Sequence, residues 1–231
     1  MTRCLRDCDA SRVSLSPRFL QVSRTARYYD LGRLDAPALW YVLHGYGQSA
    51  MDFAEVFDRA ELQGVRVVAP EALSRFYSEG GMRRHGAGDQ VGASWMTREA
   101  RLEEIHDYLD YLDQLSETIE RDRTPGARIV LGFSQGVHTA ARWVGLGQTP
   151  PTRLVAWGAP LPDDLPLEDL ALRMDGAELT LVHGETDPAF GPAAAEAEGD
   201  RLTEAGFVVH RRSHPGGHRL SRTLIRELAA G

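Results

Sequence analysis

The segment Gly-Phe-Ser-Gln-Gly at residues 132–136 constrains this chain more than any other. It follows the apolar run Ile129–Leu131, and apolar residues recur at helical spacing after it. A strand therefore turns sharply into a helix at Ser134, with glycines on both sides because side chains there would collide with neighbouring backbone. This context predicts that Ser134 is a nucleophile on an exposed elbow. The plainer alternative is a glycine-flanked turn in an ordinary α/β domain.

Short β-prone runs alternate with helical patterns from Ala26 onward, which is typical of a mostly parallel sheet with helices on both faces. Several runs lack polar alternation, as expected for central parallel strands. The clearest helix is predicted over about residues 98–121, where Leu102 lies on the apolar stripe. The glycine-rich stretch Ser74–Ala93 is interpreted as a long irregular loop, and so is Thr149–Pro166 outside its strand. The predicted strands are Arg27–Asp30, Leu39–Leu43, Val65–Ala69, Arg128–Gly132, Arg153–Trp157, Leu179–Val182 and Phe207–Arg211.

The composition is that of a globular protein with a full core. Of the 231 residues, 42% are hydrophobic and 26% are charged. We expect residues 1–24, rich in arginine and serine, to form a poorly defined extension, and residues 25–231 to form a single domain. Cys4 and Cys8 are interpreted as free thiols, with a local disulfide as the alternative.

Charge and hydropathy exclude several classes of partner. A formal net charge of −7 argues against general binding to nucleic acid or anionic membranes. The longest apolar stretch, Ala38–Leu43, is far shorter than the ~20 residues that span a bilayer. We therefore predict no stable membrane insertion. Without the apolar segment of a secretory signal, a cytoplasmic location is expected. No cofactor or metal is predicted, because the carboxylates along residues 98–121 lack convergent histidines.

An acid and a base for Ser134 both lie downstream in the chain. A serine hydroxyl is a poor nucleophile, so a base must take its proton and a carboxylate must orient that base. Asp187 follows a predicted strand and precedes a proline, which favours it over Glu185 as the acid. His218 follows the last predicted strand and a glycine pair, which favours it over His214 as the base.

Ser134, Asp187 and His218 occur in the chain order of an α/β-hydrolase, namely nucleophile, acid and base. Acyl transfer also needs donors for the developing oxyanion. The backbone N–H of Gln135 and that of Tyr46, in the turn at residues 43–48, are the candidates. The alternative for this turn is a tight connection alone.

With these residues, the chain resembles the phospholipase/carboxylesterase family of α/β-hydrolases, which includes acyl-protein thioesterases, over roughly residues 38–228. The resemblance implies that Ser134, Asp187 and His218 form the triad, with Tyr46 and Gln135 at the oxyanion hole. Val137 replaces a glycine that is common after the elbow. The matching segments are residues 43–47, Ser94 with Trp95, residues 132–136, His183 and Gly184 with Asp187, and Gly217 with His218.

The predicted function is a cofactor-independent serine esterase acting on small-molecule esters of short to medium acyl chains, with thioesters as a second class. The alternatives are a non-catalytic binding protein of the same fold, and an acyltransferase or perhydrolase using the same triad. The oligomeric state is left open. Side chains expected near the catalytic edge either line an acyl pocket or pack in the core, and these are Phe76, Tyr77, Met82, Trp95, Trp157 and Leu161.

Overall fold

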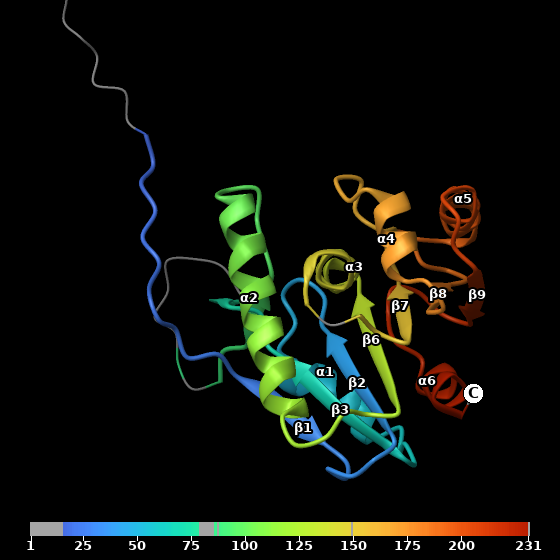
Figure 1. Cartoon of the computed structure of the whole chain (residues 1–231), viewed down its shortest axis with the longest axis horizontal. Helices are drawn as coiled ribbons and strands as arrows, with labels where there is room; N and C mark the ends of the chain where they lie inside the picture. Colours follow the sequence, from blue (N-terminus) through green and yellow to red (C-terminus); the bar gives the residue numbers. More distant parts are fainter. Residues whose placement is uncertain (1–15, 79–85, 87, 149, 231) are drawn as a thin grey trace, which may run out of the picture.

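The computed structural model describes residues 16–78, 86, 88–148 and 150–230. Its centre is a seven-stranded sheet in the order β1-β3-β2-β6-β7-β8-β9 (Figure 1). Every neighbouring pair is parallel except β1 and β3. The mostly parallel sheet predicted from the sequence is therefore confirmed. The strands are β1 (Tyr28–Leu31), β2 (Ala38–Leu43), β3 (Val65–Pro70), β6 (Ala127–Phe133), β7 (Arg153–Trp157), β8 (Glu178–Gly184) and β9 (Val209–His214).

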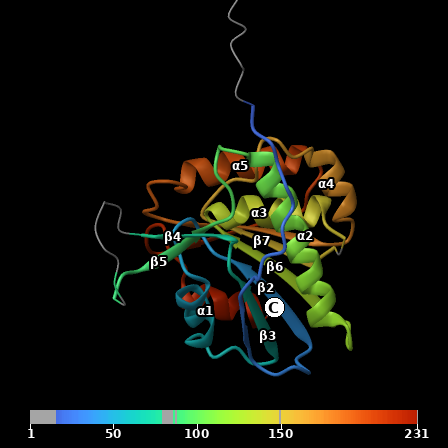
Figure 2. The same cartoon turned by 90° about the vertical axis from the view of Figure 1, so that its left-hand side faces the viewer.

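Helices cover both faces of this sheet, α2 to α5 on one side and α1 with α6 on the other (Figure 2). Alternate residues of β2 show the division. Leu39, Tyr41 and Leu43 pack in one hydrophobic cluster, whereas Trp40 and Val42 pack in the other. A strand that is buried on both faces needs no polar alternation. The helices are α1 (Ala50–Asp58), α2 (Arg101–Glu120), α3 (Gln135–Leu146), α4 (Leu167–Arg173), α5 (Pro192–Glu204) and α6 (Arg222–Ala230).

Two details of the predicted elements differ from the structure. The last strand was expected to begin at Phe207, but β9 begins at Val209. The N–H of Phe207 donates to the carbonyl of Leu202 in α5, so this residue completes the helix end instead of joining the sheet. Leu102 was expected on the apolar stripe of α2 but is 66% exposed. Leu102 lies in the first turn of α2, ahead of the part of the helix that packs on the core.

The prediction that Ser74–Ala93 is an irregular loop is wrong at both ends. Strands β4 (Ser74–Tyr77) and β5 (Val91–Ser94) pair antiparallel in a separate two-stranded sheet. Two backbone hydrogen bonds attach β5 to the turn after β2. Gly47 N–H donates to Ala93 O (2.9 Å), and Ala93 N–H donates to Gln48 O (3.1 Å). These strands are too short to show a periodicity, and only their tertiary partner defines them.

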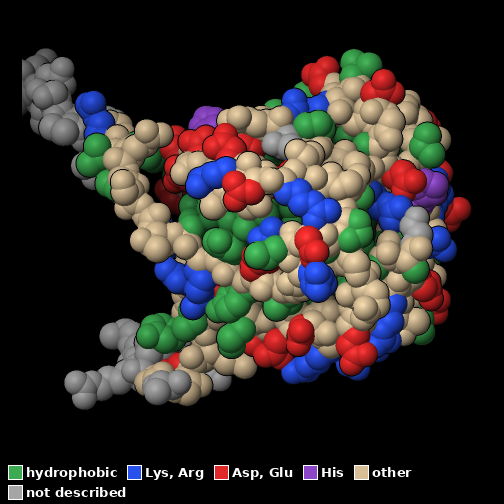
Figure 3. Space-filling model, turned by 60° about the horizontal axis from the view of Figure 1, so that its bottom comes forward, with side chains coloured by type: hydrophobic (Ala, Val, Ile, Leu, Met, Phe, Trp, Pro, Cys, Tyr) green, Lys and Arg blue, Asp and Glu red, His purple; other side chains and the backbone are tan. Residues whose placement is uncertain are grey.

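The surface carries charges of both signs. On the face shown in Figure 3, acidic and basic side chains are interspersed over most of the area. Residues 16–24, part of the predicted extension, are exposed and belong to no helix or strand, and Cys4 and Cys8 lie outside the described residues. Among the helices of the described ranges, none has the length and apolar character needed to cross a membrane.

Candidate active site

The elbow at Ser134 joins β6 to α3 through an unusual backbone conformation. Ser134 has φ 54° and ψ −119°, a region that residues with a side chain rarely adopt. Its N–H donates to Trp157 O (2.8 Å), and its carbonyl accepts from Val137 N–H (2.9 Å). Hydrogen bonds on both sides therefore hold the strained residue in place, half-buried at the carboxyl end of β6.

The glycines that flank the elbow are required by close backbone contacts. A Cβ on Gly132 would lie 2.3 Å from Gly136 O, and one on Gly136 would lie 2.1 Å from Leu43 O. Both obstacles are backbone atoms of neighbouring elements, so no rotamer change can relieve them. A side chain at either position would therefore collide with neighbouring backbone, as the sequence predicted.

Gly136→Ala is expected to lower the free energy of unfolding by about 3 kcal/mol, because the added methyl group forces α3 away from β2. Urea unfolding of the variant and the wild type measures this difference. Gly86→Ala is the matched control, since no atom of the described residues lies within 4 Å of its added Cβ. Equal stability of the two variants would contradict this account of the elbow.

Asp187 and His218 form a hydrogen-bonded pair beside the elbow. His218 Nδ1 lies 2.8 Å from Asp187 Oδ2. The other oxygen, Oδ1, accepts from the backbone N–H groups of Ala189 (2.8 Å) and Phe190 (3.1 Å). An ionised carboxylate only accepts hydrogen bonds, so Nδ1 carries the proton and Nε2 keeps a free lone pair. The Asp187 side chain is 1% exposed and that of His218 is 31% exposed, so solvent reaches the imidazole but not the carboxylate.

Hydrogen bonding keeps Asp187 charged. Burial by itself raises the pKa of this carboxyl, but the hydrogen bonds from His218, Ala189 and Phe190 outweigh burial and hold the pKa below its ordinary value. Asp187 is therefore an anion at neutral pH, as a group that orients an imidazole must be.

The residues weighed as alternatives lie elsewhere. The Glu185 carboxylate accepts a hydrogen bond from Ser213 Oγ (3.3 Å) at the exposed end of β9. His214 is 2% exposed, and its ring centroid lies 5.4 Å from that of Trp157. The geometry therefore joins Asp187 with His218 and leaves Glu185 and His214 out of the pair.

Ser134 lies close to this pair in the folded chain. The His218 ring centroid lies 4.9 Å from that of Phe133, the residue before Ser134. No hydrogen bond between the Ser134 hydroxyl and His218 occurs within the described part of the chain. Asp187 and His218 are thus already joined, and Ser134 stands beside them on the elbow. Such hydrogen bonds commonly tighten only when substrate binds.

The turn after β2 approaches Ser134 closely. A Cβ on Gly45 would lie 3.2 Å from Ser134 Cβ. His44 is fully buried, donates from Nδ1 to Gly45 O (2.8 Å), and accepts at Nε2 from Ala72 N–H (3.1 Å). Trp95 Nε1 donates to His44 O (2.9 Å). These contacts hold the turn in place beside Ser134.

The two candidate oxyanion donors have different surroundings. Tyr46 lies in this turn, and its side chain is directed outwards, 62% exposed, with its ring 5.3 Å from that of Phe76. The N–H of Gln135 belongs to the first turn of α3, where N–H groups have no partner within the helix. Gln135 thus follows Ser134 directly, and Tyr46 follows Gly45, whose added Cβ would lie 3.2 Å from Ser134 Cβ.

The Gln135 side chain has a role that sequence reasoning missed. Its Nε2 donates to Met96 O (2.8 Å), and its Oε1 accepts from Trp95 N–H (3.1 Å). It also exchanges a hydrogen bond with Ser94 Oγ (3.2 Å). The amide thus ties the end of β5 to the start of α3. Its partners are some forty positions away in the chain, so no local pattern signals them.

Three of the six side chains expected near the catalytic edge lie in the core. Trp95 is 3% exposed, and Trp157 and Leu161 are each 1% exposed. Their large apolar surfaces are already packed, which corrects the expectation that they meet substrate. Phe76 is half-buried beside Tyr46. Met82 lies outside the described residues.

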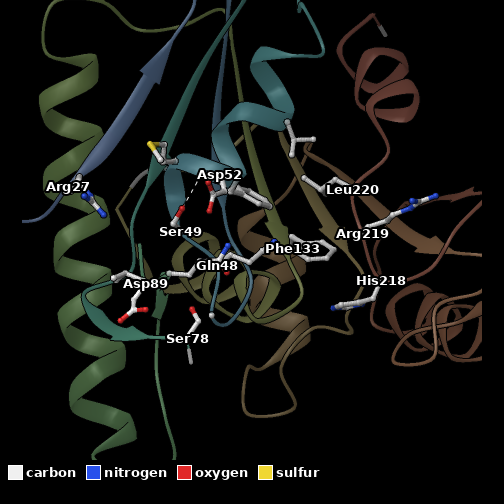
Figure 4. Close-up of a pocket in the computed structure, with 16 residues that line it drawn as sticks. Arg27, Gln48, Ser49, Asp52, Ser78, Asp89, Phe133, His218, Arg219 and Leu220 are labelled. Carbon is white, nitrogen blue, oxygen red and sulfur yellow. Dashed lines mark hydrogen bonds between the residues drawn. The ribbon is translucent and has the colours of Figure 1, made fainter. Parts of the chain in front are cut away.

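A pocket of about 680 Å³ opens beside His218 (Figure 4). The sequence analysis did not find it, because its walls come from segments distant in the chain. They are the turn after β2 with α1, the ends of β4 and β5, Phe133, and residues 218–220. Across the described residues, no group of three or more His, Cys, Asp or Glu side chains could hold a metal ion.

Stability is expected to fall as the pH drops through about 6.5. Burial lowers the pKa of His44, His138 and His214 below the ordinary histidine value. Since an unfolded histidine titrates near pH 6.5, the unfolded chain binds more protons below that pH, and protonation then favours unfolding. The free energy of unfolding is thus fully retained above about pH 6.5 and declines as the pH falls below that value.

Urea unfolding at about pH 7.5 and about pH 5.5 measures this loss. His214→Leu removes one of the three groups, and among the described residues its ring nitrogens have no hydrogen-bond partner to lose. The variant should therefore lose less stability between the two pH values than the wild type. Equal stability of the wild type at both pH values would contradict the prediction.

Comparison with known proteins agrees with this architecture. A family model described as phospholipase/carboxylesterase matches residues 34–229. Acyl-protein thioesterase 2 of Zea mays has a solved structure with a TM-score of 0.66 and 20% identity, covering 89% of this chain and 97% of that chain. A carboxylesterase of Mesorhizobium loti has a TM-score of 0.66 and 19% identity, covering 89% and 95%.

Esterase PE8 has a TM-score of 0.64 and 22% identity, covering 90% of this chain and 97% of its own. At such identities the likeness shows the fold. No curated protein matched the chain. The family follows from the match over residues 34–229: the chain belongs to the phospholipase/carboxylesterase family of α/β-hydrolases.

Proposed function

We propose that this protein is a serine hydrolase that cleaves acyl carboxylic esters of short to medium chain length, with thioesters as a second substrate class, through an acyl-enzyme. The observation that carries the proposal is the buried, charged Asp187 hydrogen-bonded to the accessible His218, beside the strained elbow at Ser134. An acid, a base and a nucleophile in this relation are what acyl transfer requires.

In the proposed reaction, His218 Nε2 takes the proton of Ser134 as its oxygen attacks the ester carbonyl. Asp187 keeps the proton of Nδ1 in place and stabilises the imidazolium that forms. The tetrahedral intermediate collapses, and His218 gives its proton to the leaving alcohol or thiol. Water then attacks the acyl-enzyme with His218 again as the base, which releases the acid and restores Ser134.

The backbone N–H groups of Gln135 and Tyr46 are proposed to stabilise the oxyanion. Negative charge develops on the carbonyl oxygen only during attack, so donors aimed there stabilise the transition state more than the substrate. Each such donor typically contributes about 3–4 kcal/mol. The rigid turn at residues 43–48 supports this role, because donors that are already in place need no reorganisation.

Three solved structures of the same fold support an ester or thioester as the substrate. Their names describe an acyl-protein thioesterase, a carboxylesterase and an esterase. The family description likewise includes carboxylesterases and phospholipases.

A fluorophosphonate probe tests the proposal directly. We expect covalent labelling of the folded protein at Ser134, identified by peptide mapping, and hydrolysis of a chromogenic ester and thioester panel that varies in acyl length. Labelling should disappear after unfolding, because the serine is activated only by its folded surroundings. A folded protein that is neither labelled nor active would instead indicate a non-catalytic binding protein. Product analysis with added alcohol or peroxide separates hydrolysis from acyl transfer and perhydrolysis.

A further inference from the structure

The end of β7 lies between the strands that lead to Ser134 and Asp187. In the sheet, β7 pairs with β6 on one side and with β8 on the other, and Trp157 is its last residue. The carbonyl of Trp157 accepts from Ser134 N–H (2.8 Å), and Gly158 N–H donates to Val182 O (2.9 Å). The backbone at residues 157 and 158 is therefore bonded both to the elbow and to the strand that leads to Asp187.

Gly158 presents a bare Cα to the imidazole of His218. A Cβ on Gly158 would lie 3.2 Å from His218 Cε1 and 3.4 Å from His218 Nδ1. Non-bonded carbon atoms pack best at about 3.5–4.0 Å. The φ of Gly158 is 76°, which is the left-handed region that glycine adopts without strain. The imidazole thus occupies space that the side chain of any other residue at this position would need.

One hydrogen bond does not fix the direction in which His218 Nε2 points. The bond from Nδ1 to Asp187 Oδ2 holds one corner of the ring, and the ring can still turn and tilt about that corner. Gly158 lies against Nδ1 and Cε1, the edge that leads from the bonded nitrogen to Nε2. Phe133 packs on the ring as well, with centroids 4.9 Å apart (Figure 4). These contacts together define the orientation of Nε2.

The atoms around the imidazole are held more firmly than the ring itself. Asp187 is 1% exposed, and its Oδ1 accepts from two backbone N–H groups. The loop that carries His218 is anchored, because Gly216 O accepts from Thr186 N–H (2.9 Å). The ring is the end of a side chain and yields most easily. A methyl group added at Gly158 would therefore displace the imidazole by a few tenths of an ångström.

We infer that Gly158 is a positioning residue for the reaction: its bare Cα gives the His218 imidazole the orientation in which Nε2 meets the Ser134 hydroxyl. The inference rests on the proposed function and assigns the end of β7 a part in it. A misplacement of about 1 Å can lower a rate by about 100-fold. A displacement of about half that size is then expected to lower the rate by about tenfold.

Gly158→Ala tests the inference, and Gly176→Ala is its matched control. Gly176 has a φ of 77°, so alanine meets the same backbone strain at both positions, but no atom of the described residues lies within 4 Å of a Cβ added at Gly176. We expect the two variants to lose similar stability in urea unfolding. Only Gly158→Ala should lose activity, by about tenfold in kcat/KM for a chromogenic butyrate ester and in the rate of fluorophosphonate labelling.

Two NMR measurements report the position of the imidazole itself. In the wild type, we expect a nuclear Overhauser effect between Hα of Gly158 and Hε1 of His218, because the two residues lie in contact. The Nδ1 proton should give a signal shifted downfield by its hydrogen bond to Asp187. This signal should move in Gly158→Ala and stay unchanged in Gly176→Ala. A general loss of stability would not move it, since the signal comes from the folded protein.

Wild-type activity and an unmoved Nδ1 signal in Gly158→Ala would overturn the inference. Equal losses of activity in both alanine variants would also overturn it, because backbone strain would then be the cause. If Gly158→Ala does not fold, Gly158→Asn and Gly176→Asn replace the pair, since asparagine tolerates positive φ better than alanine.

The Overhauser effect needs no variant, and its absence from the folded wild type would contradict the inference by itself. A folded wild type that shows this effect, yet hydrolyses no ester and is not labelled, would instead reject the proposed function. The failure of the inference and the failure of the proposed function are thus distinguished by separate measurements.

Discussion

Replacing Ser134 with alanine is expected to lower kcat for ester hydrolysis by about a millionfold, the scale seen when the nucleophile of a serine hydrolase is removed. Without the hydroxyl no acyl-enzyme forms, and only binding and the oxyanion donors remain to assist water. Initial rates on the best ester of the panel, with fluorophosphonate labelling in parallel, measure the loss. An active and labelled Ser134→Ala protein would mean that another residue is the nucleophile.

Stability measurements on the same position separate chemistry from folding. Ser134 has a φ of 54°, which glycine adopts without strain and alanine does not. Ser134→Gly is therefore expected to be inactive like Ser134→Ala, yet about 1 kcal/mol more stable. Thermal unfolding of the two variants checks this difference. Stability in the reverse order would show that the elbow stores no strain at this residue.

Asp187→Asn is expected to lower kcat by about ten-thousandfold while the protein stays folded. The amide oxygen of asparagine can replace Oδ1 as the acceptor for Ala189 and Phe190. Its NH₂ group then faces His218 Nδ1 and forces that nitrogen to accept. The proton moves to Nε2, which can no longer act as a base. Activity over a pH series and the NMR signals of the imidazole protons measure both consequences.

Glu185→Gln is the matched control for Asp187→Asn. Glu185 is two residues away, exposed, and bonded to Ser213 rather than to a histidine. Its replacement should leave kcat unchanged. Loss of activity in Glu185→Gln with retained activity in Asp187→Asn would identify Glu185 as the acid and contradict the geometry proposed for the site.

Local patterns predicted the sheet and the elbow well, because their causes are local. The β-prone runs that became β2, β3, β6, β7 and β8 are mostly apolar and lack regular polar alternation, and such segments are buried as central strands. The glycines at 132 and 136 indicate a turn in which neither position can accommodate a Cβ. The β4–β5 pair was missed because its strands are held by residues 47 and 48 and not by their own periodicity.

The candidate site shows the same division. Sequence reasoning named Ser134, Asp187 and His218 from their places after strands, since the carboxyl ends of parallel strands meet at one edge of a sheet. It could not tell whether an aromatic side chain near that edge faces a substrate or the core. Trp95 and Trp157 are buried, while most residues that line the pocket beside His218 carried no motif.

The sequence by itself therefore determined the parallel sheet, the elbow at Ser134 and the chain order of the candidate nucleophile, acid and base, because backbone sterics and strand burial act between near neighbours. Only the tertiary structure decided that Asp187 and not Glu185 meets His218, and that an open pocket lies on the histidine side. The hydrogen bonds and the pocket join segments that are far apart along the chain, so no local pattern in the sequence predicts their contact.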